Sequence, residues 1–246
     1  MPDKRRHRGK HPDDDRLFAV SCQPTLRAAV EHLSWLLTRG YARPSALKLV
    51  GDRFSLTQRQ RMAVRRSACS DSSLQRRRRT RCDLSHIAAK PLGIDGYNLL
   101  ITVESALSGG LILVGRDGCY RDLASIHGTY RKVEETLPAV TLIADFVQSL
   151  NGSHIDWYLD RPVSNSGRLK VLMAETLQDR GRSTPSGQGP DWNLELVHSP
   201  DAVLADYRGV VASSDSVILD RCAAWTNLAA ELITARIPEA WRVDLR

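Results

Sequence analysis

The chain lacks the sequence features of a membrane protein, of a secreted protein and of a structural zinc site. No stretch approaches about 18 uninterrupted apolar residues, and no apolar segment follows the charges of the N-terminus, so we expect neither a membrane span nor a secretory signal. The five cysteines are odd in number, and no two have Cys-x-x-Cys spacing, which argues against zinc and redox motifs. These absences predict a cytoplasmic protein with reduced thiols.

Aromatic residues are also scarce, at 6% of the chain, but hydrophobic residues make up 42%, which is enough for a real core. The length of 246 residues allows one large domain or two small ones. Charge is the most uneven property, since the formal net charge is +7 and the sequence pI is about 9.4. The basic residues concentrate at Lys4–Arg8 and at Arg76–Arg81.

A basic balance of this kind favours a polyanionic partner, with nucleic acid first and an anionic membrane second. Either cluster is equally compatible with a solvated charge run in a flexible linker. Because no apolar anchor accompanies the basic tails, we expect no membrane partner and treat nucleic acid as the leading candidate.

Composition divides the chain into four parts. Residues 1–16 are polar and charged and are expected to form a disordered basic tail, whereas residues 17–70 show helical periodicity. Three short helices rich in arginine would make a small all-α domain, which either binds nucleic acid or serves as a packing module. Residues 71–87 are interpreted as an Arg-rich linker, and residues 88–246 as a separate α/β domain.

In the last part, short apolar runs alternate with helical patterns. Strands are predicted at 92–94, 155–159, 192–197 and 209–212 and around Val243. Long helices are predicted at 120–150 and at 217–236. Strands that alternate with helices predict a mainly parallel sheet covered on both faces.

Acidic residues follow several of these strands. Asp95, Asp160 and Asp215 each come after a predicted strand, and Asp201 begins the helix between the third and fourth strands. The carboxyl ends of parallel strands are where ligands bind, and neighbouring carboxylates repel each other unless a cation lies between them. Their hard oxygens suit Mg²⁺ or Mn²⁺.

We expect Asp95 and Asp215 to be the direct metal ligands. Asp160 would be a third ligand or would position the attacking water, and Asp201 would assist. Two simpler interpretations remain open. Asp201 is a good helix cap after Ser199 and Pro200, and Asp160 before Arg161 is compatible with an ion-paired turn residue.

Further residues are candidates for binding nucleic acid or supporting the acidic site. Phosphate contacts are expected from Arg116, Arg121, His127, Arg131 and the run Arg76, Arg77, Arg78 and Arg79. Tyr130 would stack on a base. Asn98, Glu104 and Ser213 are expected to support the carboxylates. The alternatives are a salt-bridged helix face for the first group and a local turn contact for Asn98.

The run Ile94-Asp95-Gly96-Tyr97-Asn98 resembles the opening motif of the PIN-like superfamily, especially its NYN branch of ribonucleases. The segments Ser199–Asp201 and Ala212–Asp215 resemble the later half of that superfamily, so that the resemblance covers about residues 88–246. It implies a three-layer α/β/α fold with a five-stranded sheet and Mg²⁺- or Mn²⁺-dependent cleavage of RNA. The whole chain, including Leu49–Phe54 and Gln58–Arg61, also resembles an uncharacterised prokaryotic family with a helical N-terminal part.

Three functions are compatible with these features. The first is a metal-dependent nuclease, with RNA favoured over DNA as substrate, and the second is a non-catalytic nucleic-acid-binding or adaptor protein on the same fold. The third is a phosphatase or nucleotide-processing enzyme. The basic clusters argue against the third function, because a small substrate needs no extended cationic track.

Overall fold

A five-stranded, all-parallel sheet forms the centre of the molecule. The computed structural model describes residues 7–124, 130–182 and 189–246. The strands are β1 (Leu92–Asp95), β4 (His154–Asp160), β5 (Asp191–Val197), β6 (Val210–Ala212) and β7 (Trp225–Thr226). Their order across the sheet is β5-β4-β1-β6-β7, and every neighbouring pair is parallel. The predicted fold class is therefore confirmed.

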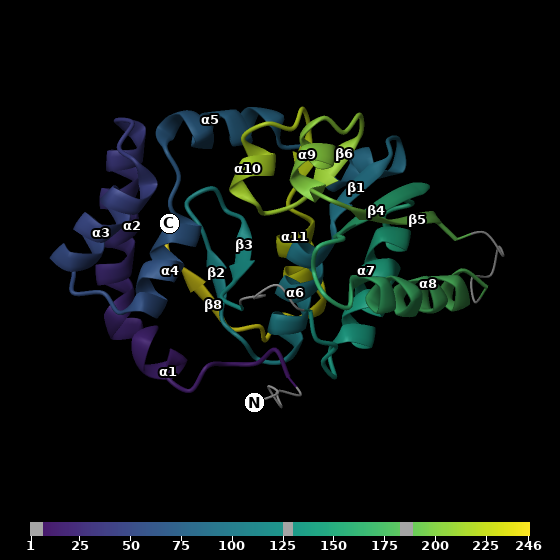
Figure 1. Cartoon of the computed structure of the whole chain (residues 1–246), viewed down its shortest axis with the longest axis horizontal. Coiled ribbons are helices and arrows are strands. Elements are labelled where there is room, and N and C mark those ends of the chain that lie inside the picture. Colours follow the sequence, from purple (N-terminus) through teal and green to yellow (C-terminus); the bar gives the residue numbers. More distant parts are fainter. Residues whose placement is uncertain (1–6, 125–129, 183–188) are drawn as a thin grey trace.

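Helices cover both faces of this sheet (Figure 1). One face carries α6 (Gly96–Leu107), α7 (Thr136–Ser149), α8 (Ser166–Arg182) and α11 (Leu228–Arg236). The other face carries the short helices α9 (Pro200–Ala205) and α10 (Ser216–Leu219). No helix in the described part of the chain is both long and apolar enough to cross a lipid bilayer.

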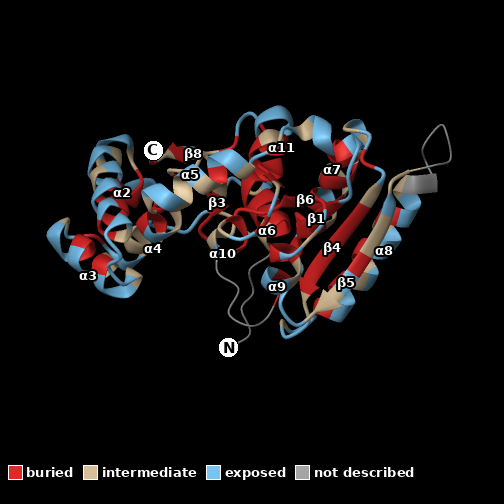
Figure 2. Ribbon diagram, turned by 90° about the horizontal axis from the view of Figure 1, so that it is seen from above, coloured by how far each residue is buried: buried red, intermediate tan, exposed pale blue. Residues whose placement is uncertain are grey.

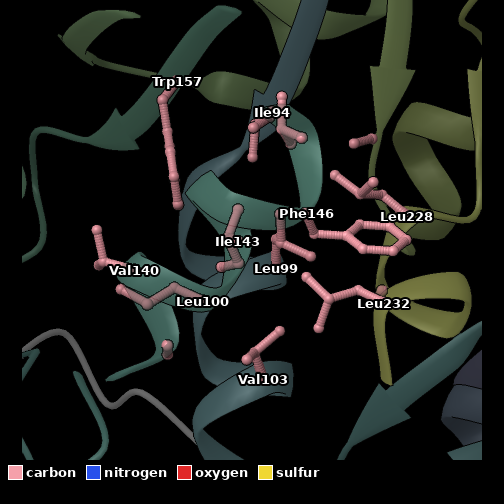
Figure 3. Close-up of a cluster of buried hydrophobic side chains, with 14 of the residues drawn as sticks. Ile94, Leu99, Leu100, Val103, Val140, Ile143, Phe146, Trp157, Leu228 and Leu232 are labelled. Carbon is pink, nitrogen blue, oxygen red and sulfur yellow. The ribbon is translucent and has the colours of Figure 1, made fainter. Parts of the chain in front are cut away.

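The main hydrophobic core lies between the sheet and the larger helical layer. Ile94 and Trp157 point from β1 and β4 toward Leu99, Ile143 and the other apolar side chains of α6, α7 and α11 (Figure 3). Ile94 and Trp157 share this face because they are paired in register across the parallel strands β1 and β4. A continuous apolar layer therefore fixes β1 and β4 from one side.

The alternation of side chains assigns the acidic strand ends to the opposite face. Tyr158 packs with Leu204 of α9 in a second, smaller cluster. Asp160 follows Tyr158 by two residues, and Asp95 follows Gly93 by two, so each shares the face of its predecessor. A Cβ atom added at Gly93 would lie 2.9 Å from the Leu204 side chain, which places that residue on the same side. Asp95 and Asp160 thus end their strands on the face that α9 covers.

A second sheet joins the C-terminal part to the N-terminal helices. It consists of β2 (Ile112–Val114), β3 (Tyr120–Asp122) and β8 (Arg242–Asp244), in the order β3-β2-β8. Leu113 and Val243 share one buried cluster with Leu26, Leu33 and Val64 of the N-terminal helices. The helical region and the α/β part are therefore packed through a common core.

The N-terminal helices lie at one end of the molecule, and β5 and α8 lie at the other (Figure 2). The helical region contains α1 (Asp14–Leu17), α2 (Gln23–Thr38), α3 (Arg43–Arg53), α4 (Gln58–Ser67) and α5 (Asp71–Thr80), together with two 3₁₀ turns at Val20–Cys22 and Leu84–Ala88. Thr57 begins α4 with a capping box, in which its side chain and that of Gln60 satisfy each other's backbone N–H groups.

Two predicted helices are wrong. Residues 120–150 begin as strand β3, which forms a hairpin with β2 through Gly118 in the left-handed region at φ 79°, and only the later part is helix α7. The helix predicted at 217–236 is interrupted by β7, which is the fifth strand of the main sheet. The predicted strand around Val243 exists, but it belongs to the second sheet.

The predicted tail and linker also differ from the structure. Within residues 7–16, Arg8 ion-pairs with buried Glu104, and the buried carboxylate of Asp14 ion-pairs with Arg59, so this part of the tail is ordered. Residues 71–80 of the linker form helix α5, which begins with Ser70 as its cap. Amino-acid composition does not predict the structure of these two segments, because it does not show the long-range ion pairs that compensate for their high charge.

Arg77 holds α5 against the rest of the molecule. Its side chain is 2% exposed and ion-pairs with Asp117 at 2.5 Å and with Asp220 at 2.8 Å. Arg78, the next residue on the same helix, is exposed. Substitutions at these two neighbouring residues therefore distinguish the loss of a buried ion pair from the loss of one positive charge on the helix.

We predict that Arg77→Ala lowers the free energy of unfolding by about 3–5 kcal/mol, because it leaves the buried Asp117 carboxylate with one cation fewer. Arg78→Ala should change it by less than about 0.5 kcal/mol. Urea unfolding of both variants beside the wild type measures the difference. Equal losses of stability in the two variants would contradict the ion-pair role of Arg77.

Candidate functional site

The first element of the site is the tight turn between β1 and α6. Asp95 is the last residue of β1, and Gly96 is the first of α6. A Cβ atom at Gly96 would lie 2.4 Å from the carbonyl oxygen of Tyr158, so the close approach of the start of α6 to β4 requires glycine. The turn leaves the Asp95 side chain at the carboxyl edge of the sheet, where the residue is 6% exposed.

The segment after β6 brings a second carboxylate to this edge. Ser213 donates a hydrogen bond from Oγ to Asp95 Oδ2 at 2.7 Å, and it accepts one from the backbone N–H of Asp215 at 2.9 Å. Asp215 in turn caps α10, since its Oδ1 accepts from the backbone N–H of Val217 at 2.7 Å. A single hydroxyl group therefore links Asp95 to the backbone of Asp215.

Ser214 is fixed from two sides. Asn98 Oδ1 accepts from the backbone N–H of Ser214 at 3.0 Å and from its hydroxyl at 2.9 Å. Arg121 Nε donates to the Ser214 carbonyl oxygen at 2.8 Å. Asn98 thus holds the strand end beside Asp95 through Ser214, rather than by a hydrogen bond to Asp95 itself.

Asp201 and Asp160 complete the acidic edge. Ser199, and not Asp201, caps α9, because the Ser199 hydroxyl accepts from the backbone N–H of Ala202. The carboxylate of Asp201 is exposed in the first turn of that helix. Asp160 is the last residue of β4 and half-buried. Within the described residues, none of Asp95, Asp160, Asp201 and Asp215 has a Lys, Arg or His side chain within ion-pair distance.

Burial and mutual repulsion raise the pKa values of three carboxylates of the cluster, and Arg221 opposes this at Asp201. Burial raises the pKa of Asp95 to about 7; the Ser213 hydroxyl opposes this, whereas the charges of Asp215, Asp201 and Asp160 add to it. Burial and the charge of Asp201 raise the pKa of Asp160, and burial and the charge of Asp215 raise that of Asp201. The ionisation of Asp95, Asp160 and Asp201 is therefore less favourable than in water, in part because of the charges of neighbouring carboxylates.

Three of the four carboxylates open into a cleft of about 730 Å³. Asp95, Asp201 and Asp215 line it, whereas Asp160 does not. A further part of the lining is basic and comes from the N-terminal helices, namely Arg43 of α3 and Arg65 and Arg66 of α4. The cleft thus combines an acidic sheet edge with arginines of the helical region.

The donor set fits a hard divalent cation that retains water. No group of three or more His, Cys, Asp or Glu side chains in the described ranges is arranged so that it could hold a metal ion. Mg²⁺, however, is commonly bound by one or two carboxylates, waters and substrate phosphates rather than by a full protein cage. Asp95 and Asp215, which lack a cationic partner in the described structure, are suited to that mode.

Two residues expected at the site lie in a different network. Tyr130 is 1% exposed and hydrogen-bonds through its hydroxyl to Glu104, so its ring is not available to stack on a base. Glu104 is fully buried, where it ion-pairs with Arg8 and accepts from Thr136 at 2.7 Å. Glu104 belongs to this buried network and does not line the cleft, because it lies two helical turns beyond Asn98 and faces the N-terminal segment.

Most of the arginines expected to contact phosphate are engaged within the protein. Arg121 is buried and ion-paired with Asp117, Arg116 pairs with Asp71, and Arg76 donates to the Arg221 carbonyl oxygen. Arg77 is the buried residue described above. Arg78, Arg79 and Arg131 are exposed, and His127 lies outside the described residues. Buried ion pairing therefore removes Arg77 and Arg121 from the set of phosphate ligands.

The arginines of the cleft are not singled out by any motif in the sequence. Arg43 precedes a proline at the start of α3, and Arg65 lies in the last turn of α4. Neither belongs to a dense basic run, and their position in the same cleft as Asp95 depends on tertiary packing. The adjacent pair Arg65-Arg66 is the only local pattern that could have drawn attention to them.

Fold and site together define an α/β protein with a parallel sheet, an acidic carboxyl edge and a helical N-terminal region. The chain belongs to the family described as a domain of unknown function (DUF5616), whose profile matches residues 84–231. Residues 25–80 match a second profile, described as a protein of unknown function (DUF434). These matches confirm the expected relation to an uncharacterised prokaryotic family.

A relative in the archaeon Methanocaldococcus jannaschii, the uncharacterized protein MJ0935, is 29% identical over 195 residues. The aligned region covers 79% of this chain and 89% of the relative, so the similarity includes both the helical region and the α/β part. No solved structure matches the chain.

We predict that Asp95→Asn stabilises the metal-free protein at neutral pH. The pKa of Asp95 is about 7 in the folded protein and near 3.9 in an unfolded chain, so the folded state binds more protons between these values. The stability contributed by the protonated carboxyl group is present below about pH 4 and is lost as the pH rises through 7. The variant should therefore exceed the wild type by up to about 4 kcal/mol above pH 7.

Urea unfolding in EDTA over this pH range tests the prediction. Asp191→Asn is the matched control, because Asp191 lies at the start of β5, at the other end of the strands from the acidic cluster. A difference between Asp95→Asn and wild type that stays constant from pH 4 to 8 would contradict the burial of an uncompensated carboxylate.

Proposed function

We propose that this protein is a metal-dependent nuclease that hydrolyses phosphodiester bonds, with RNA as the preferred substrate. One observation carries the proposal: Asp95, Asp201 and Asp215 line one cleft at the carboxyl edge of a parallel sheet and have no cationic partner among the described residues. Carboxylates in this arrangement repel one another, and a divalent cation relieves that repulsion.

Sequence resemblance supports the same function. The run from Ile94 to Asn98 resembles the opening motif of the PIN-like superfamily and its NYN branch, and it forms the β1–α6 turn that holds Asp95. The later segment, which resembles the second half of that superfamily, forms the hydrogen-bonded link between Ser213 and Asp95. These two segments are over a hundred residues apart in the sequence and adjacent in the fold.

The roles follow from position. Asp95 and Asp215 would hold Mg²⁺ or Mn²⁺, which when bound polarises the phosphate and lowers the pKa of an attacking water. Asp201 lines the cleft, so it would orient that water. Its raised pKa would help it accept the proton of the water. Asp160, outside the cleft lining, adds negative potential at Asp95.

A second function is favoured by one specific finding. Because no three acidic side chains in the described residues are arranged to hold a metal ion, the same fold is also compatible with a non-catalytic nucleic-acid-binding or adaptor protein. In that case the buried carboxylates would be inherited architecture, and RNA would bind without being cut.

Cleavage of labelled single-stranded RNA with Mg²⁺ or Mn²⁺, compared with EDTA, distinguishes the two functions. We expect cutting by the wild type only with metal, and Asp95→Asn and Asp215→Asn should each reduce it more than about 100-fold, since even residues that merely orient a metal ligand cost 10–100-fold. Asp191→Asn, which removes a carboxylate at the opposite edge of the sheet, should retain wild-type activity.

Binding measured on the same proteins completes the test. Metal-dependent cutting that Asp95→Asn abolishes while RNA binding persists supports the nuclease. Tight binding without cutting by any of the proteins would overturn the nuclease and favour the adaptor.

A further inference from the structure

We propose that Arg43 and Arg65 bind the phosphate backbone of a single-stranded nucleic acid, so that the N-terminal helical region forms the substrate-holding side of the cleft. The inference rests on the proposed function only in the identity of the polyanion. Both arginines lie in the helical region, outside the acidic cluster.

The first observation is that these two arginines have no anionic partner within ion-pair distance in the described part of the chain. Arg43 makes one hydrogen bond, from Nη1 to the carbonyl oxygen of Arg65 at 3.4 Å, and that contact brings the two residues together. Arg66, by contrast, ion-pairs with Asp122 and donates to the Ala124 carbonyl oxygen. Two of the three arginines that the N-terminal helices contribute to the cleft are therefore available to a ligand.

The second observation is that Arg43 lies near two further arginines, Arg65 and Arg77. Partial burial and the charges of Arg77 and Arg65 lower the pKa of the Arg43 guanidinium group, and Asp220 opposes this from beyond ion-pair distance. A bound phosphate would supply the missing anion between neighbouring guanidinium groups, which recognise phosphate through charge-assisted hydrogen bonds.

The third observation is that Arg43 and Arg65 share the cleft with the carboxylates of the sheet edge, whereas Arg66 pairs with Asp122 in the same cleft. Asp95, Asp201 and Asp215 belong to the sheet edge, and Arg43 and Arg65 belong to α3 and α4, yet no ion pair joins the two sets in the described structure. A phosphodiester suits both, because its phosphates contact the arginines while a divalent cation at the carboxylates contacts the bond to be cut.

The size of the cleft is compatible with a short piece of one strand. A volume of about 730 Å³ falls in the range of clefts that take small molecules, roughly 300–1,000 Å³. A short piece of a single nucleic-acid strand fits such a space. Its bases are not paired with a second strand, so the protein can contact them directly. Tyr97 and Ile101 add an apolar part to the lining, against which a base or ribose can rest.

The test measures the affinity of the full-length protein for a fluorescent single-stranded RNA in EDTA, which prevents hydrolysis. The variant Arg43→Ala/Arg65→Ala is compared with Arg53→Ala/Arg236→Ala, which removes the same charge from two exposed positions outside the cleft. Arg43→Lys/Arg65→Lys retains the charge and controls for folding, which thermal unfolding checks in every variant.

We expect the cleft variant to bind at least about tenfold more weakly, since charge-assisted hydrogen bonds are among the strong ones. The negative slope of log K against log salt should decrease in magnitude by roughly 0.7 for each phosphate that the variant no longer neutralises. The lysine variant and the outer control should stay within about threefold of the wild type. Binding of single-stranded DNA, compared with single-stranded RNA, shows whether the ribose 2′-hydroxyl group is required. Duplex RNA should bind more weakly than single-stranded RNA.

Two results would overturn the inference: equal affinity of the cleft variant and wild type, or equal weakening in the outer control, which would show an effect of net charge alone. Duplex RNA that binds as tightly as single-stranded RNA would overturn the assignment to one strand. The outcome is separate from that of the nuclease. Weaker binding by the cleft variant without any cutting by the wild type supports this inference and overturns hydrolysis, whereas Asp95-dependent cutting with unchanged binding does the reverse.

Discussion

The carboxylate of Asp117 lies between the buried guanidinium groups of Arg77 and Arg121. Arg121 donates from Nη1 and Nη2 to its two oxygens at 2.8 and 2.6 Å, and Arg77 donates from Nη1 at 2.5 Å. Although burial opposes ionisation, the two cations hold the pKa of Asp117 well below its usual range. A buried carboxylate needs such compensation, and removing either cation leaves an uncompensated charge in the interior.

The rest of the site depends on this contact. Arg121, once fixed by Asp117, donates to the Ser214 carbonyl oxygen and so positions the strand end that carries Asp215. Arg77, fixed by the same carboxylate and by Asp220, attaches helix α5 to the α/β part. These ion pairs therefore connect the N-terminal helices to the acidic edge, and in the proposed function they hold substrate-binding arginines and catalytic carboxylates in one frame.

Sequence reasoning predicts the parts of this arrangement that depend on local pattern. The short apolar run before Asp95 and the glycine after it predict a strand that ends in a tight turn, and the structure has β1 followed directly by α6. The acidic residues after β4 and β6 are found at the same edge, because all strands of that sheet are parallel. The roles proposed for these residues stay predictions until activity is measured.

The parts that sequence reasoning misses depend on contacts distant in sequence. The three-residue strand β3 is too short to be distinguished from a helix by periodicity, so residues 120–150 are predicted as a helical region. A run of arginines does not show which member is buried, because Arg77 differs from Arg78 only in facing Asp117 and Asp220 across the fold. The same limit applies to Arg43 and Arg65, whose place in the cleft results from packing between helices and sheet.

The central claim is that the acidic edge binds a divalent cation between Asp95 and Asp215. Anomalous diffraction from crystals grown with Mn²⁺ tests it most directly, since the signal locates the metal without reference to activity. The account predicts a Mn²⁺ peak in contact with the carboxylates of Asp95 and Asp215, and no such peak in crystals of Asp95→Asn. A peak only elsewhere on the molecule, with these two carboxylates clearly ordered and free of metal, would contradict it.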